Sequence, residues 1–318
     1  MTSPQSRCDD FKTQLKRFAT DELGFDAIGV ARAEPVDDQA MARYREWLAG
    51  GRHGDMDWAS RHGELRDDPR LLLDGARTVI VVALNYLPAV RQPEGSARVA
   101  MYAYGRDYHR VLRQRLTRLA RHITDGTGNA CRVTVDSAPM RERYWAVKAG
   151  VGFIGVNNAL FLPGRGSFFF LGTLLTTLEL EPDEPCRDTC LHCLRCVKAC
   201  PTGALSPDGL AADARRCLSA ITIENHDATL PTEVASKLGD RVVGCDTCQL
   251  CCPLNADAVP TTVPDFAPRA AVMGLTPERI AEMTPEEFDS AFAGSAVRRV
   301  TLPTLQRNAA AKQSESNV

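Results

Sequence analysis

Cysteine residues form the most informative chemical pattern in this chain of 318 residues. The chain has 12 of them, and most fall in the short stretch between Cys186 and Cys252. Disulfide frameworks are typical of short secreted chains, whereas clustered thiols in a longer chain more often bind metal. The crowding therefore favours ligation of a metal or a cluster over structural cross-linking.

The first cysteine motif has the spacing of two-cluster bacterial ferredoxins. Its members, with the proline that follows them, are Cys190, Cys193, Cys196, Cys200 and Pro201. In such proteins the first three thiolates hold one [4Fe–4S] cluster, and the fourth ligates the other cluster. A tetrahedral zinc site requires neither this compressed spacing nor the proline. The motif therefore predicts iron–sulfur clusters.

A second motif lies downstream and contains Cys245, Cys248, Cys251, Cys252 and Pro253. If the two motifs exchange their fourth ligands, Cys252 completes the first cluster and Cys200 joins the second. The second cluster then lacks one thiolate, for which Cys251 and Cys217 are the candidates. Adjacent side chains diverge, so Cys251 and Cys252 cannot easily serve two clusters, and this favours Cys217. Cys186 and the unused candidate become spare thiols.

Three further signals are weaker. Asp136 lies at the end of a predicted strand, in the segment VDSAP, and strand ends often carry the chemistry of α/β folds. On its own, however, this position favours an aspartate that only forms a turn. The segment 150–155 matches G-x-G-x-x-G, but a helix-like segment precedes it, so we interpret it as a turn and not a dinucleotide site. A run of arginines is either a solvated helix face or a stripe that contacts phosphates: Arg106, Arg110, Arg113, Arg115, Arg118 and Arg121.

The elements that must position these residues divide into three parts. Residues 1–180 predict a mixed α/β domain with helices over 11–23 and 110–123 and strands over 27–31, 78–84 and 131–135. Residues 168–178 are apolar and could form a strand or a buried helix. Residues 181–258 form the cysteine domain, with a helix expected over 212–223. Residues 259–318 combine a proline-rich linker, short helices over 276–292 and a polar last ten residues expected to fray.

Composition limits the class of protein. The chain is 44% hydrophobic and 25% charged with a net charge of −2, which is ordinary for a globular protein and does not indicate a bulk polyanion binder. Its apolar runs are far shorter than the ~20 residues of a membrane span, and its N-terminus lacks a signal-peptide core. We therefore expect a cytoplasmic protein without a membrane partner, and nothing requires more than a monomer.

Taken together, the motifs resemble one family, the epoxyqueuosine reductases. The resemblance rests on CLHCLRCVKACPTGAL, DARRCLSAITIE and GCDTCQLCCPLN, and upstream on YGRDYHRVLRQRL, VDSAPMRER and KAGVGFIG. It extends to GSAVRRVTLPTLQRNAA and so covers nearly the whole chain in order.

The resemblance implies an α+β or α/β fold with a cobalamin-binding domain, a ferredoxin-like domain with two [4Fe–4S] clusters, and a short helical C-terminal segment. It implies an oxidoreductase, related to the corrinoid reductive dehalogenases, that reduces epoxyqueuosine at the wobble position of tRNA to queuosine. The electrons would come from an external donor.

The resemblance also assigns residues. One cluster would be held by Cys190, Cys193, Cys196 and Cys252, and the other by Cys200, Cys217, Cys245 and Cys248. The proton donor corresponds to Asp136, which we expect to be buried with a raised pKa, because a carboxylic acid must stay protonated to donate at neutral pH. Contacts to cobalamin would come from Arg66, Leu160, Leu171, Ser219, Asp246 and Thr247.

Three positions depart from the family pattern by losing a charge: Met101, Val156 and Thr173. They support an alternative, a corrinoid and iron–sulfur reductase of a small molecule. A second alternative is a non-catalytic electron-transfer protein, although Asp136 and the YGRDYH segment argue against it.

Overall fold

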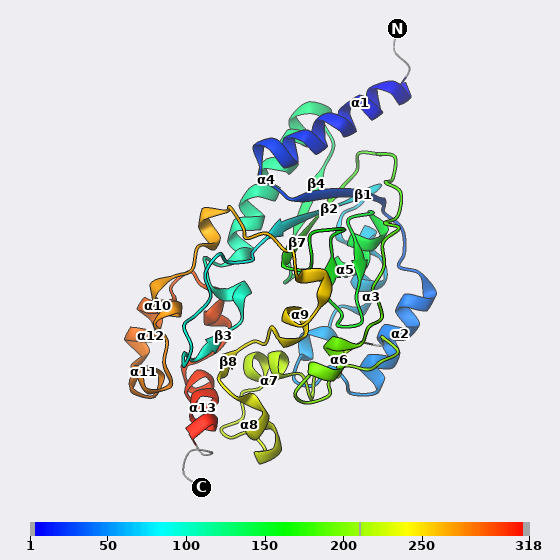
Figure 1. Ribbon diagram of the computed structural model, residues 1–318. Helices are drawn as coiled ribbons and strands as arrows, with labels where there is room; N and C mark the ends of the chain where they lie inside the picture. Colours follow the sequence, from blue (N-terminus) through cyan, green and yellow to red (C-terminus); the bar gives the residue numbers. More distant parts are fainter. Residues whose placement is uncertain (1–3, 210, 314–318) are drawn as a thin grey trace.

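An antiparallel four-stranded sheet organises the first half of the chain in the computed structural model, which describes residues 4–209 and 211–313. The strand order is β1-β2-β7-β4 (Figure 1). The strands of this sheet are β1 (Ala27–Arg32), β2 (Thr78–Asn85), β4 (Cys131–Thr134) and β7 (Phe169–Thr176). The short pairs elsewhere are β3 (Arg98–Val99) with β8 (Arg241–Val243), and β5 (Phe153–Ile154) with β6 (Leu160–Phe161).

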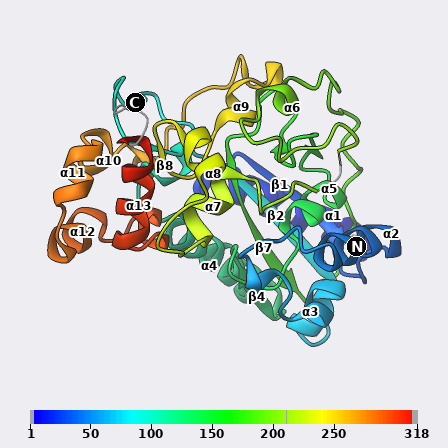
Figure 2. The same cartoon turned by 90° about the horizontal axis from the view of Figure 1, so that it is seen from below.

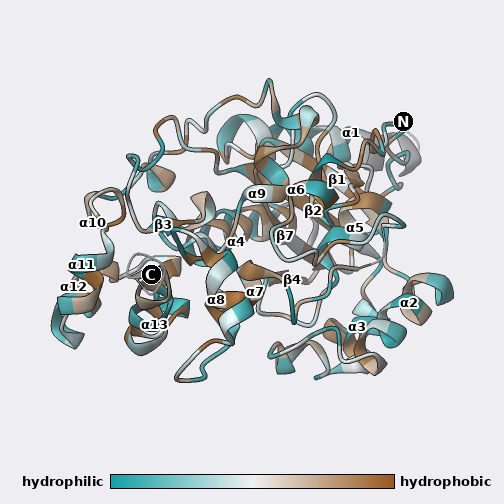
Figure 3. Cartoon of the chain, turned by 60° about the horizontal axis from the view of Figure 1, so that its bottom comes forward, coloured by the Kyte–Doolittle hydropathy of each residue, from teal (hydrophilic) through white to brown (hydrophobic). Residues whose placement is uncertain are grey.

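The central strand β2 is buried on both faces, which explains its uninterrupted apolar sequence. Successive side chains of a strand point to opposite faces. The even-numbered residues Ile80, Val82 and Leu84 accordingly enter one core cluster, and the odd-numbered residues Val79, Val81 and Ala83 enter another. Figure 3 shows apolar residues gathered around β2 and β7, with hydrophilic residues on the peripheral helices.

Helices cover both faces of this sheet. The long helix α4 (Tyr108–Thr127) packs against β4 and β7 through Leu112, Leu116 and their neighbours in the first core cluster. On the other face, α5 (Glu142–Lys148) packs against β1, β2 and β7 with Trp145 fully buried. The other N-terminal helices are α1 (Pro4–Arg17), followed by a π-helical turn, α2 (Asp38–Ala49) and α3 (Gly63–Asp67).

The cysteine-rich segment is a module of short helices at the lower side of Figure 1. It contains α6 (Arg195–Ala199), α7 (Leu218–Glu224), α8 (Thr232–Leu238) and α9 (Thr247–Leu250). Each cysteine motif leads into one of two helices, α6 and α9, which pack against each other. This pairing brings together two motifs that lie about fifty residues apart in the sequence.

The C-terminal helices are joined to the first domain and do not form a separate layer. They are α10 (Ala270–Met273), α11 (Pro277–Glu282), α12 (Pro285–Phe292) and α13 (Leu302–Gln313). Their buried residues, such as Phe292 and Leu305, belong to the core cluster that also contains Leu112 of α4. The parallel pairing of β3 with β8 makes a further link between the first domain and the cysteine module. The domain boundaries stay predictions, but one core crosses them.

Most expected elements are confirmed. The apolar segment 168–178 contains the strand β7, and the segment 150–155 is a turn followed by the two-residue strand β5. The threonine expected to start a helix, Thr284, forms a capping box with Glu287. Figure 2, which views the molecule from below, shows the C-terminal helices grouped beside β8.

Two expectations about helices are wrong. The helix expected over 212–223 starts at Leu218, because Asp213 instead accepts hydrogen bonds from the backbone N–H and guanidinium of Arg215 and forms a turn. The last ten residues were expected to fray, but α13 continues to Gln313, and Ala309 is buried against the core. Residues 314–318 of that tail lie outside the described residues.

None of the described helices is long and apolar enough to cross a membrane.

Gly29 of β1 allows the end of α5 to approach the sheet. A Cβ atom at this position would lie 2.1 Å from the carbonyl oxygen of Ala149, a backbone atom that cannot rotate away. We expect Gly29→Ala to lower the free energy of unfolding by about 1–3 kcal/mol or more, the usual cost of overpacking. Thermal unfolding of the purified chain measures this effect. Gly63→Ala is the matched control, because nothing lies within 4 Å of its added carbon; equal melting temperatures for the two variants would contradict the packing argument.

Candidate functional site

Asp136 lies at the start of the loop that follows β4, with a left-handed backbone (φ 49°) that is uncommon for a residue with a side chain. Its Oδ2 atom accepts a hydrogen bond from the Tyr108 hydroxyl at 2.8 Å and lies 2.9 Å from Nε2 of His109. Its backbone N–H donates to Oε1 of Glu142 at 2.8 Å. Three residues from α4 and α5 therefore fix the position of this carboxylate.

The start of α4 orients the two partners of Asp136. Asp107 is the N-cap of this helix, and its carboxylate accepts from the backbone N–H of His109 and lies 2.7 Å from Nδ1 of the same residue. Both ring nitrogens of His109 thus face a carboxylate. The Tyr108 ring stacks on Phe170 of β7 with 4.3 Å between centroids. Packing and capping together hold the tyrosine and histidine in place.

The electrostatics of this cluster leave the proton on His109. Burial opposes a charge on His109, but its hydrogen bonds to Asp107 and Asp136 outweigh burial and raise its pKa to about 9. Asp136 is only partly withdrawn from water, and this partial desolvation opposes its ionisation, but hydrogen bonds from His109 and Tyr108 outweigh it and lower the pKa of this carboxyl. At neutral pH the pair is an imidazolium beside a carboxylate.

The expectation for Asp136 was therefore wrong in two respects. Its side chain is 54% exposed, and its pKa lies below the usual range, because the neighbouring imidazolium stabilises the carboxylate. The raised carboxyl pKa belongs to Glu142, where burial and the charge of Asp136 raise it to about 8. A protonated acid is thus present at the site, but it is Glu142 and not Asp136.

The four cysteines assigned to the first cluster line one cavity. Its walls contain Cys190, Cys193, Cys196 and Cys252, together with apolar residues such as Val156 and Phe161. No group of three or more His, Cys, Asp or Glu side chains in the described residues converges on a single metal ion. Four thiols around a mainly apolar cavity fit a cluster better than one ion.

The four cysteines assigned to the second cluster also lie together. Cys217, at the start of α7, is within electrostatic range of Cys245 and Cys200, and Cys248 of α9 is within range of all three. Cys251 lies instead among the first group, within range of Cys193. The fold therefore brings Cys217, and not Cys251, to the group that lacked a thiolate.

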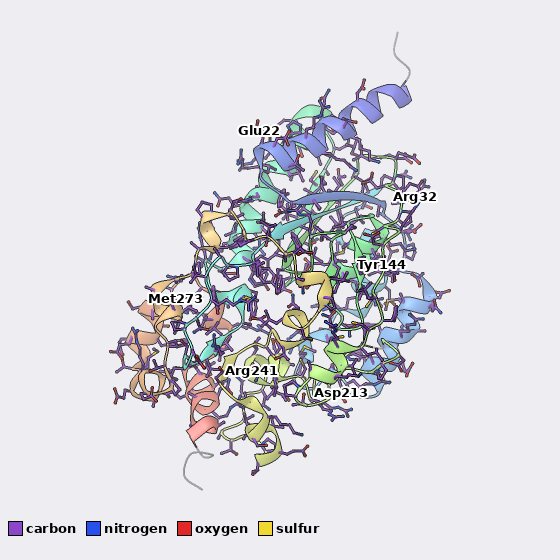
Figure 4. The ribbon with its side chains drawn as sticks, viewed as in Figure 1. Glu22, Arg32, Tyr144, Asp213, Arg241 and Met273 are labelled. Atoms are coloured by element: carbon purple, nitrogen blue, oxygen red, sulfur yellow. The ribbon has the colours of Figure 1, made fainter. Side chains whose placement is uncertain are left out.

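The residues assigned to cobalamin are brought together only in part. Leu160 and Leu171 pack in the same core cluster on the face of the sheet covered by α5. Asp246 precedes α9 and accepts from the backbone N–H of Met101 at 2.8 Å, and burial raises its pKa to about 6. The hydroxyl of Thr247 accepts from the guanidinium of Arg241, the first residue of β8 (Figure 4).

The other two residues assigned to cobalamin differ in their surroundings. Ser219 of α7 is half-buried, and its hydroxyl has no hydrogen-bond partner within residues 4–209 and 211–313. Arg66 is buried in its own loop, where it donates to the carbonyl oxygens of Arg61 and Trp58. The described contacts do not join Arg66 to the rest of the set.

The cluster module and Asp136 share a neighbour that sequence reasoning missed. Tyr102 is within electrostatic range of both Asp136 and Asp246, and of Arg299 in the C-terminal segment. Glu142 was also missed, because the sequence offered only an acidic residue at a helix start. Tyr108 and His109 belong to the YGRDYH segment on which the family resemblance rests, but nothing in the sequence showed that they face Asp136.

The three charge-losing positions are all buried. Thr173 is fully buried in β7, and its hydroxyl is hydrogen-bonded to Thr134 of the neighbouring strand. Met101 is buried in the first core cluster, and Val156 lines the cavity of the first cysteine group. Each uncharged side chain is therefore accommodated by its own packing.

Two family models match the chain. The model described as "Epoxyqueuosine reductase QueG, DUF1730" matches residues 66–137, which include Asp136 and the start of α4. The model described as "4Fe-4S double cluster binding domain" matches residues 189–255, which include all eight assigned cysteines.

Similar curated proteins cover almost the whole chain. An epoxyqueuosine reductase of Gloeobacter violaceus is 44% identical over 294 residues, which cover 90% of this chain and 91% of that protein. An epoxyqueuosine reductase of a Synechococcus species is 40% identical and covers 98% of this chain and 97% of that protein.

Similar solved structures share the fold. An epoxyqueuosine reductase crystal structure superposes with a TM-score of 0.88 at 29% identity, over 96% of this chain and 82% of that chain. A second, with an epoxyqueuosine-modified tyrosine tRNA stem loop, gives 0.86 at 29% identity with the same coverage. A third, from Bacillus subtilis, gives 0.86 at 28% identity with the same coverage, and its catalytic aspartate loop is swung out of the active site.

Proposed function

Because the chain belongs to the epoxyqueuosine reductase family, we propose that it reduces epoxyqueuosine at the wobble position of tRNA to queuosine, using two [4Fe–4S] clusters and cobalamin. The observation that carries this proposal is one fold that holds two groups of four cysteines and a carboxylate–imidazolium pair, with Tyr102 within range of both regions. The similar structure with a modified tRNA stem loop supports the choice of substrate.

The reaction has a fixed balance. Removing the epoxide oxygen breaks two C–O bonds and forms one C=C bond, so the epoxide takes up two electrons and two protons and releases one water. The clusters supply electrons singly, and cobalamin, when bound, supplies a cobalt centre that can react in two-electron steps. The chain's own side chains must deliver the protons.

The proton supply is assigned to the Asp136 cluster. Asp136 is exposed and therefore accessible to substrate, while His109 behind it holds a proton up to about pH 9. Because Asp136 is ionised at neutral pH, the proton for the departing oxygen starts on His109 Nε2, crosses the 2.9 Å contact to Oδ2 of Asp136 and passes from there to the substrate. Asp107, bonded to Nδ1, stabilises the imidazolium between turnovers. The exposed loop of Asp136 is consistent with the swung-out aspartate loop of the Bacillus subtilis relative.

The assigned residues fit the two kinds of cofactor. Cys190, Cys193, Cys196 and Cys252 would hold one cluster, and Cys200, Cys217, Cys245 and Cys248 the other. For cobalamin, the apolar Leu160 and Leu171 suit contact with a macrocycle, and the unpartnered hydroxyl of Ser219 can bind an amide. Asp246 and Thr247 lie beside the second cysteine group and would contact cobalamin from that side. Arg66 would contact the periphery of the cofactor.

The remaining parts of the proposal concern partners and location. The turn at 150–155 lacks the strand and helix of a dinucleotide site, so we assign the electrons to an external donor. We assign the chain to the cytoplasm, where its tRNA substrate resides, and to a monomer.

His109 gives a test based on pH. In the wild type we expect activity to persist until about pH 9, where His109 loses its proton. In His109→Gln, Asp136 alone must hold the proton, and its pKa lies in the usual acidic range, so the alkaline limb should move down by at least about two pH units. A pH profile of kcat measures this shift, and an unchanged alkaline limb would contradict the relay.

The raised pKa of His109 also makes the stability of the fold depend on pH. Because the folded pKa of His109 is raised above its unfolded value of 6.5, its contribution to stability is full below about pH 6.5 and is lost as the pH rises through about 9. In His109→Gln the melting temperature should therefore decline less between about pH 6.5 and pH 9 than in the wild type. A decline as steep as that of the wild type would show that other groups cause it.

The proposed activity is tested by nucleoside mass analysis of tRNA from a strain that lacks only this gene, with and without a rescue plasmid. The proposal predicts epoxyqueuosine in the deletion strain and queuosine after rescue. Unchanged queuosine in a strain without a second reductase would refute it.

A further inference from the structure

One face of α4 carries a row of exposed arginines. The surface is lined by Arg110, Arg113, Gln114, Thr117, Arg118 and Arg121, which we call the arginine face. The opposite face of the helix is buried against the sheet through Leu112, Leu116 and Leu119. Packing therefore does not require arginine at the exposed positions.

The arginine face gathers four arginines on one surface of a single helix. Some exposed arginines elsewhere form ion pairs with aspartate or glutamate, as in Arg45 with Asp67 and Arg215 with Asp213. Among residues 4–209 and 211–313, the four arginines of the arginine face form no ion pair within 4.0 Å. The acidic residues of the helix and its cap are Asp107, at the N-cap, and Asp125, exposed near the far end of the helix.

Crowded like charges repel one another along this helix. Arg118 disfavours the charge on Arg115, whose pKa is lowered by burial and by this neighbour. The chain as a whole has a net charge of −2, so this local excess runs against its overall balance. A cationic face of this kind is complementary to a polyanion.

The position of the arginine face beside Asp136 indicates which polyanion it binds. The helix begins at Tyr108 and His109, which contact Asp136, so the arginine face starts beside the reacting group. From Arg110 it extends about 16 Å along the helix axis. The reacting nucleotide belongs to an RNA loop, and the phosphates of the adjoining stem must leave the site over the neighbouring surface. Guanidinium groups bind phosphate oxygens in a bidentate fashion.

We propose that the arginine face of α4 binds the phosphate backbone of the anticodon stem, while the loop nucleotide occupies the site at Asp136. This inference rests on the proposed function and adds the surface that holds the substrate. An acidic electron-donor protein is the competing occupant. It is disfavoured because α4 lies on the far side of the sheet from α6 and the first cysteine group (Figure 2).

The test compares two triple variants of the full chain with equal loss of charge. In the first, Arg113, Arg118 and Arg121 are replaced by Gln; in the control, Arg45, Arg70 and Arg215, which are exposed and ion-paired, are replaced by Gln. Binding of a synthetic, unmodified anticodon stem-loop RNA is followed by fluorescence anisotropy from low to moderate salt. A single-stranded RNA of the loop sequence alone is the second probe.

We expect the first variant to weaken stem-loop binding and to reduce the magnitude of the slope of log K against log salt by about 2 to 3. Each of the three lost phosphate contacts accounts for about 0.7–0.9 of this change. Its affinity for the loop RNA should match that of the wild type. The control variant should retain the wild-type slope. With modified tRNA, the first variant should raise KM and leave kcat unchanged, because the groups at Asp136 are intact.

Other outcomes separate the two proposals. Equal slopes for the two variants would refute the arginine face, even if the wild type reduces epoxyqueuosine. A slower supply of electrons with unchanged RNA binding would refute it in favour of a donor protein. If the wild type binds the stem-loop through this face but fails to reduce modified tRNA, the surface assignment stands and the proposed reaction fails.

Discussion

Replacing Asp136 by Asn is expected to lower kcat by about 10²- to 10⁴-fold, the usual contribution of a positioned proton donor. The amide keeps the size of the side chain and can still accept from the Tyr108 hydroxyl, but it cannot pass a proton. Cluster content and binding of stem-loop RNA should remain those of the wild type. Single-turnover rates with modified tRNA under saturating reductant measure the effect.

Asp289→Asn provides the control for this variant. Asp289 is an exposed carboxylate that pairs with Arg298 at the surface of α12, so its loss removes the same charge away from the site. Its kcat should equal that of the wild type. Full activity in Asp136→Asn would show that Asp136 is not the proton donor. The donor would then be Glu142 or His109, the groups that hold protons at neutral pH.

Replacing Cys217 by Ser is expected to abolish turnover and to remove about half of the cluster iron. Cys217 lies with Cys200, Cys245 and Cys248, and a hydroxyl replaces a thiolate poorly as an iron ligand. Because electrons pass singly through both clusters, loss of one should stop the reaction. Iron analysis and electron paramagnetic resonance of the anaerobically purified chain measure the loss.

Cys251→Ser is the matched comparison. This thiol donates weakly to the carbonyl oxygen of Cys248 and is within range of Cys193, so it lies beside the first group without being needed by the pattern. We expect full iron content and normal turnover. If Cys251→Ser loses the iron and Cys217→Ser keeps it, the assignment of the second cluster is reversed.

Local sequence was sufficient where one physical signal dominated. The uninterrupted β-branched run of β2 predicted a buried strand, and Thr284 with Glu287 predicted a helix start. The run 168–178 stayed ambiguous because a short apolar segment has no periodicity that separates a strand from a buried helix. Its pairing with β2 and β4, which decides the matter, is a long-range property.

The candidate site was predictable in its residues and not in its electrostatics. Spacing alone favoured Cys217 over Cys251, because adjacent side chains diverge. The pKa of Asp136, however, depends on Tyr108 and His109 from α4 and on Glu142 from α5. Without those partners, burial seemed the natural way to keep an acid protonated. The fold instead keeps the proton on a histidine between two carboxylates.

The most direct test of the account is reduction of epoxyqueuosine-containing tRNA by the purified chain, with reconstituted clusters, added cobalamin and a chemical reductant under anaerobic conditions. Nucleosides are then analysed by mass spectrometry beside a matched reaction with Asp136→Asn. The account predicts conversion to queuosine over many turnovers by the wild type and almost none by the variant. If the wild type, with both clusters and cobalamin bound, leaves epoxyqueuosine unchanged, the central claim is contradicted.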